Sequence, residues 1–146
     1  MVLEDKSREE SIMQDLKNYY NGYKFYLLSQ DSLYNSDMVL YFLDDFKRKQ
    51  TYPIQILDPN IMPDYGKLKH FFELANWQEN IKVLEEVLEQ GNVSCEQIYQ
   101  FSFETDFGRR EFINFLYYLG NLTIEGRNIA GETIFKIPNK VIAELY

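Results

Sequence analysis

The beginning of the chain is marked by apolar side chains at helical spacing. Ser7 and Glu10 are placed as in a capping box, where the serine and glutamate side chains satisfy backbone amides at the start of a helix. Beyond them, apolar positions recur three or four residues apart, at Ile12, Met13, Leu16, Tyr19 and Tyr20. The pattern predicts a helix over residues 8–20.

A second helix is predicted over residues 37–47, and it is apolar on almost every side. Leu40 and Leu43 lie three residues apart and share one face, while Phe42 and Phe46 lie four apart and share another. A helix that is apolar all round is normally buried. We therefore expect this helix to be the centre of the packing.

The segment between these two helices is rich in aromatic residues. Asn21-Gly22 is suited to ending the first helix, because glycine adopts the left-handed conformation at little cost. Tyr23–Leu28 has the composition of a strand or extended run, and either Asn35 or Ser36 can cap the following helix. We expect the aromatic side chains of this segment to belong to the core.

The rest of the chain alternates helical patterns with turn-forming residues. Residues 50–63 contain three prolines and are predicted to connect elements, as is the loosely alternating segment 93–103. Helices are predicted over 65–75, 81–88 and 112–119, and a last one begins after Asn139; two short strands are predicted at 122–124 and 133–137. The fold class is therefore mainly α with a small β-hairpin, and the order helix, hairpin, helix resembles the end of a winged-helix unit.

Charge and cysteine content limit the classes of function. The 146 residues carry a net charge of −8, and residues 106–146 are neutral, with five basic and five acidic groups. Nucleic acid is thus an unfavoured partner, because binding to phosphates depends on Lys and Arg. Cys95 is the only cysteine, which excludes an intrachain disulfide and a cysteine-based metal cluster and favours a cytoplasmic setting. The charged N-terminus is unlike a secretory signal, and no apolar run is long enough to cross a membrane.

No group of residues predicts catalysis. The phosphate-binding pattern G-x-x-x-x-G-K-[ST] is absent, so we expect no ATP hydrolysis by this chain and no enzyme activity of its own. His70 is the only histidine and has no evident catalytic partner. Asp44-Asp45, or Asp58 with Asp64, could chelate a cation, but solvated carboxylates are the favoured interpretation. We expect neither a metal nor another cofactor.

Arg109 and Arg110 are the candidate phosphate contacts. They precede the core of the helix predicted at 112–119 and could face a nucleotide or a nucleic-acid backbone. Ion pairs with the acidic remainder of the chain are the favoured alternative.

Several motifs together resemble a known family. YNGYKF at 20–25 and LYNSDMVLYFL at 33–43 are similar to the Tyr-Asp/Asn-Gly-Tyr and Tyr-Asn-Pro-Trp-Ser motifs of the AAA-ATPase-like family, whose bacterial members often also carry a PD-(D/E)XK nuclease-like domain. Further similarity lies at 56–68, 115–124 and 135–146. The motif residues are Tyr20, Asn21, Gly22, Tyr23, Tyr34, Asn35, Gly120, Pro138 and Asn139.

This resemblance implies a function for the chain. It would be the region C-terminal to a nucleotide-binding core, with a helical lid-like part at 1–91 and a winged-helix-like part at 92–146 that can pack as one unit. Ser36 and Asp37 stand where the family often has Pro-Trp, and they would face the nucleotide from a helix N-terminus.

The function implied is regulation or coupling without catalysis. The partners would be the neighbouring ATPase core of the parent chain and, where present, its nuclease-like domain. The alternative is a winged-helix module that binds nucleic acid through residues 106–146.

Overall fold

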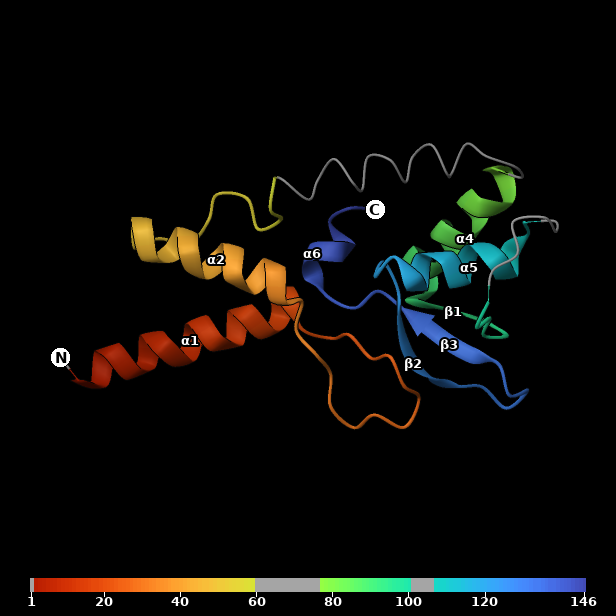
Figure 1. Cartoon of the computed structure of the whole chain (residues 1–146), viewed down its shortest axis with the longest axis horizontal. Coiled ribbons are helices and arrows are strands. Elements are labelled where there is room, and N and C mark those ends of the chain that lie inside the picture. The colour runs from red at the N-terminus through yellow and green to blue at the C-terminus, as the bar shows by residue number, and fades with distance from the viewer. Residues whose placement is uncertain (1, 60–76, 101–106) are drawn as a thin grey trace.

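The computed structural model describes residues 2–59, 77–100 and 107–146, which form five helices and a three-stranded antiparallel sheet. Figure 1 shows α1 and α2 as a helical arm on one side and α4, α5 and the sheet on the other, with the short α6 between them. The elements in chain order are α1 (Val2–Tyr20), α2 (Ser36–Lys49), α4 (Trp77–Gln90), β1 (Asn92–Cys95), α5 (Arg109–Tyr118), β2 (Thr123–Arg127), β3 (Thr133–Lys136) and α6 (Lys140–Ala143).

The predicted helices and the hairpin are confirmed wherever the structure describes them. The helices predicted at 8–20, 37–47, 81–88 and 112–119 correspond to α1, α2, α4 and α5, and Asn139 caps α6 as expected. The hairpin corresponds to β2 and β3. The helix predicted at 65–75 lies outside the described residues.

The fold class needs one correction, because the fold is mixed α/β. Residues 92–95, where a connecting segment was predicted to begin, form strand β1, and the strand order is β1-β3-β2. Val93 of β1 and Ile124 of β2 both lie opposite Phe135 of β3. The central strand is therefore paired on both sides, and all three of these side chains are buried.

Tyr23–Leu28, predicted to be a strand or an extended run, does not form a strand. Only Tyr23 is paired, in an isolated antiparallel bridge to Leu33. A turn follows, in which the Ser29 amide donates to the Tyr26 carbonyl oxygen at 3.1 Å. After this bridge the chain forms a loop that lies below α6 and beside β2 in Figure 1. Its aromatic residues Phe25, Tyr26 and Tyr34 are exposed.

Two groups of buried side chains hold the molecule together. In the sheet unit, α4, α5 and the strands contribute Val83, Val87, Val93, Cys95, Phe112, Ile113, Leu116, Tyr117, Leu122, Ile124 and Phe135. In the arm, α1, α2, the segment after α2 and α6 contribute Leu16, Tyr20, Met38, Phe42, Leu57 and Val141. The packing does not follow the division predicted after residue 91, because α4 belongs to the sheet unit and α6 packs on the arm.

The expectation that α2 is buried all round is wrong. Phe42 is fully buried in the arm, but Leu40 is 64% exposed and Leu43 is 43% exposed. The face with Phe42 packs against α1 and α6, whereas the opposite face lies on the surface. The apolar composition predicted that both faces are buried, because composition does not show which face is covered by another element.

In the described part of the chain no helix is both long enough and apolar enough to span a membrane.

Candidate functional site

The motif residues singled out in the sequence meet where the arm joins the sheet unit. We call this junction the arm anchor; it comprises residues 20–24, Asn35, Thr123, Pro138 and Asn139. These residues come from the end of α1, the start of α2, strand β2 and the start of α6. Hydrogen bonds here join residues that are up to 118 positions apart in the sequence.

Two asparagines cap helices and also hold the end of α1. The side-chain oxygen of Asn35 accepts from the Met38 amide at the start of α2, while the Asn35 amide donates to the Tyr20 carbonyl oxygen at 2.8 Å. Asn139 caps α6 through the Ile142 amide, and its Nδ2 donates to the Asn21 carbonyl oxygen at 3.0 Å. Since the last carbonyls of a helix lack partners within it, both caps satisfy groups that would otherwise be open. Three helices therefore share one connection.

Gly22 lies where the segment after α1 approaches the backbone of Pro138. Its φ of +107° is rarely adopted by residues with a side chain. A Cβ on Gly22 would lie 1.9 Å from the carbonyl oxygen of Pro138, which is far inside contact distance. Glycine is therefore required here both by its backbone conformation and by the space available.

Asn21 completes the turn at the end of α1. It is 7% exposed, and its Oδ1 accepts from the Gly22 amide and from the Ser32 hydroxyl. Through this hydrogen bond, Ser32 holds the returning end of the α1–α2 loop against the arm anchor. This buried polar group has its partners within the turn, as a buried amide requires.

The arm anchor is tied to the sheet through Lys24. Its backbone amide donates to Oγ1 of Thr123 at 2.6 Å, and the Ile124 amide approaches the Lys24 carbonyl oxygen at 3.5 Å. A second tie is made by Tyr117 of α5, whose hydroxyl donates to the Phe25 carbonyl oxygen at 3.3 Å. The loop after α1 therefore lies along the edge of β2.

Tyr23 fills the space beneath this loop. It is 6% exposed, and one edge of its ring faces Gly120, where a Cβ would lie 3.6 Å from the ring. Burial raises the pKa of the Tyr23 hydroxyl, and hydrogen bonding with Asn139 and Asn35 partly opposes this rise. Tyr23 is therefore a neutral, structural residue. Tyr34 is the motif residue that remains on the surface, with 41% exposure.

The candidate phosphate contacts are held by carboxylates. Arg109 Nη1 lies 2.8 Å from Glu86 Oε2. Arg110 pairs with Glu96 at 3.1 Å and with Glu111 at 2.9 Å. Glu111 also accepts from the Gly108 amide. Desolvation would raise the pKa of Glu111, but hydrogen bonds from its own backbone amide, from Arg110 and from the Gly108 amide outweigh this and lower the pKa. These contacts agree with the expectation that the two arginines form ion pairs within the chain.

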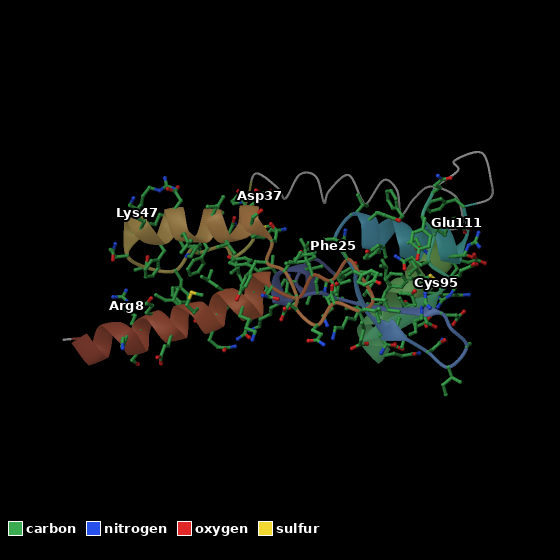
Figure 2. All side chains as sticks on the ribbon, turned by 60° about the horizontal axis from the view of Figure 1, so that its bottom comes forward. Arg8, Phe25, Asp37, Lys47, Cys95 and Glu111 are labelled. Atoms are coloured by element: carbon green, nitrogen blue, oxygen red, sulfur yellow. The ribbon has the colours of Figure 1, made fainter. Side chains whose placement is uncertain are left out.

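Ser36 and Asp37 do not join these arginines. Both are exposed in the first turn of α2, where Asn35 is the cap. Figure 2 shows Asp37 at the start of α2 and Glu111 at the far end of the sheet unit. The nucleotide-facing and phosphate-contacting residues proposed from the sequence thus form no common site.

The side chains that commonly bind metals are not grouped in the described residues. No three His, Cys, Asp or Glu side chains are close enough to hold a metal ion there. Asp44 and Asp45 instead form ion pairs with Arg48 and Lys49 one turn along α2. His70 and Asp64 lie outside the described residues. Burial raises the pKa of the Cys95 thiol to about 12, so it is not a nucleophile at neutral pH.

Sequence reasoning missed Ser32, Lys24 and Thr123 in the arm anchor. Each forms hydrogen bonds with a segment that is distant along the chain, and no local pattern marks such contacts. Comparison with protein-family models, with curated proteins and with solved structures finds no match to this chain.

Proposed function

We propose that this chain is a non-catalytic coupling region of an AAA-ATPase-like protein. It would act beside a nucleotide-binding core that these 146 residues do not themselves contain, since they have no phosphate-binding loop of the Walker type. Its role would be to carry a change of position from one part of the parent protein to another. The motif resemblance is the reason for proposing this family. The arm anchor is the feature through which a movement of the arm could reach the sheet unit.

The arm anchor is the observation on which the proposal depends. The end of α1 is bonded to the caps of α2 and α6, and four residues later the chain is bonded to β2. A displacement of the arm would therefore strain contacts to the sheet unit directly. A partner can shift such an arrangement only if it contacts two arrangements of the arm with different affinity. The exposed face of α2, with Leu40 and Leu43, is available for such a contact.

A test begins with the coding sequence that surrounds this chain. The proposal requires a Walker-type loop in the same protein or in a protein that binds it. ATP hydrolysis by the assembled protein would then be measured for wild type, Gly22→Ala at the arm anchor, and Gly131→Ala in the β2–β3 turn as a control.

We expect Gly22→Ala to change the hydrolysis rate at a temperature where it remains folded, and Gly131→Ala to leave the rate unchanged. The chain alone should give no binding heat with Mg-ATP. Absence of any associated ATPase core, or equal rates in all three proteins, would contradict the coupling role.

The order of elements in the sheet unit favours a second candidate function. Helix α4, strand β1, helix α5 and the β2–β3 hairpin, with strand order β1-β3-β2, are compatible with a winged-helix module that binds nucleic acid. Two observations count against it: Arg109 and Arg110 form ion pairs with glutamates, and α5 has no other basic residue. We therefore keep it as the alternative.

A further inference from the structure

The loop between α1 and α2 exposes large apolar side chains on one side of the molecule. Phe25, Tyr26 and Leu28 are 61%, 63% and 73% exposed. Leu33 and Tyr34, on the returning part of the same loop, are 57% and 41% exposed. Isolated exposed apolar residues are common on proteins, but a contiguous group of them marks a binding surface.

Two hollows lie on either side of Phe25. The first, of about 270 Å³, is lined by Phe25, Leu33 and Tyr34 from the loop and by Tyr118 and Leu119 from the end of α5. None of the lining residues that the structure describes is charged. In Figure 2, Phe25 lies in the middle of the molecule, between the arm and the sheet unit.

The second hollow, of about 360 Å³, lies between the loop and the edge of β2. Phe25 and Tyr26 form one wall, and Tyr99, which is 75% exposed, forms another. Among the described residues that line it, Arg127 is the one that carries a charge. We call the two hollows, with Phe25 as the ridge between them, the aromatic groove.

Arg127 differs from the other arginines of the chain. Arg48, Arg109 and Arg110 each form ion pairs, and Arg8 donates to the Gln50 carbonyl oxygen. In the part of the chain that the structure describes, Arg127 has no carboxylate within ion-pair distance. It is an exposed cation beside an apolar hollow whose described lining residues include no Asp or Glu.

We propose that the aromatic groove binds an extended acidic peptide segment of another protein, with two large apolar side chains in the two hollows and a carboxylate on Arg127. Buried apolar anchors supply most of the affinity at such interfaces, and a single ion pair selects the register. The net charge of −8 acts weakly here, because at physiological salt charges are screened beyond about 8 Å. Glu96 and Glu132 lie near Arg127 in the lining of an adjoining hollow, but neither is in the described lining of the aromatic groove. This inference needs no nucleotide and does not rest on the ATPase proposal.

The charge of the surface selects a peptide over other occupants. A single-stranded nucleic acid could stack on the tyrosines, but its affinity would need a row of cations along the phosphates. Arg127 is the single cation among the described residues that line the groove. A second copy of this chain would bring a further −8 to the same surface.

The test uses the whole chain and a phage-displayed library of random peptides. Enriched peptides are synthesised with a fluorescein label and titrated against wild type and variants by fluorescence anisotropy. The variants are Phe25→Ser and Tyr99→Ser in the groove, Arg127→Glu for the charge, and Leu88→Ser as the matched control, since Leu88 is an exposed apolar residue of α4 that lines neither hollow. Circular dichroism establishes that each variant is folded, and Tyr99→Ser keeps the test valid if Phe25→Ser is not.

We expect enriched peptides with two large apolar residues and at least one Asp or Glu. Binding should weaken about tenfold in Phe25→Ser or Tyr99→Ser, as for an anchor residue, and about fivefold in Arg127→Glu, while Leu88→Ser binds as wild type does. Arg127→Glu should prefer the peptide in which Lys replaces the acid.

Other outcomes would overturn the proposal. These are failure to enrich any peptide, binding that is unaffected by the groove variants, and no preference for acidic peptides. Binding of an oligothymidine strand that is lost in Phe25→Ser would identify nucleic acid as the occupant instead. Dimerisation of wild type, lost in the same variant by analytical ultracentrifugation, would identify a second copy.

Discussion

Gly22→Ala is the substitution to which the arm anchor should be most sensitive. An alanine at this position must keep a φ near +107° or move the backbone, and its Cβ would meet the Pro138 carbonyl oxygen at 1.9 Å. Neither problem can be relieved by turning a flexible side chain, since both involve backbone atoms. The segments at residues 22 and 138 must therefore separate.

The magnitude follows from what this separation breaks. A non-glycine residue at positive φ costs about 1–3 kcal/mol. Moving Pro138 away also weakens the bond from Asn139 Nδ2 to the Asn21 carbonyl oxygen, and one hydrogen bond contributes about 1 kcal/mol. Together with the imperfect packing that results, we expect a loss of about 3–4 kcal/mol, against a typical total stability of about 5–15 kcal/mol.

Gly131→Ala provides the matched control. Its φ of +85° gives a comparable backbone strain, but nothing lies within 4 Å of the Cβ that alanine would add. We expect this variant to lose about 1–2 kcal/mol. Urea unfolding followed by circular dichroism measures both losses by linear extrapolation. Equal losses in the two variants would show that the contact between Gly22 and Pro138 does not contribute, and the reasoning would be refuted.

Three further predictions test other parts of the structure. In urea unfolding, Phe42→Ala should cost about 3–5 kcal/mol because Phe42 is fully buried, whereas Leu40→Ala should cost less than about 0.5 kcal/mol; similar losses would mean that α2 is covered on both faces after all. Cys95 should not react with Ellman's reagent at pH 8 unless urea is added. Because folding raises the pKa of the thiol from 9.0 to about 12, the protonated thiol contributes stability that is complete below pH 9 and is lost as the pH rises towards 12. Rapid reaction of the native protein would contradict the burial of Cys95. In mobility-shift assays at physiological salt, DNA binding should be weak and equal in wild type and a double variant with Arg109→Ala and Arg110→Ala; sub-micromolar binding lost in the double variant would favour the winged-helix alternative.

Helix positions were predictable because they depend on local patterns. The 3.6-residue periodicity placed α1, α2, α4 and α5 within a few residues of their observed bounds, except that α1 begins earlier. Cap chemistry placed Asn35 and Asn139 at helix starts, where their side chains do accept backbone amides.

Strand β1 could not be predicted in the same way. It has four residues, and two of them are polar, so its pattern is too short to distinguish a strand from a connecting segment. What makes it a strand is its pairing with β3, about forty residues later, where Val93 lies opposite Phe135. That pairing is a property of the fold.

The second wrong prediction concerned which apolar side chains are buried. Apolar composition placed Leu40, Leu43 and Phe25 in the core along with Phe42, yet these three are exposed. Sequence shows which side chains would gain from burial but not whether another element is present to cover them. The same limit hid the arm anchor, because the approach of Gly22 to Pro138 joins segments more than a hundred residues apart.

Native-state hydrogen exchange tests the central claim, that the arm anchor makes the arm and the sheet unit one cooperative structure. Amides along α2 and α5 would be followed in wild type and in Gly22→Ala, because exchange reports the free energy of opening for each region separately. We expect the most protected amides of both helices to lose protection by the same factor in the variant. If α2 alone loses protection while α5 exchanges as in wild type, the two units open independently, and the arm anchor does not couple them.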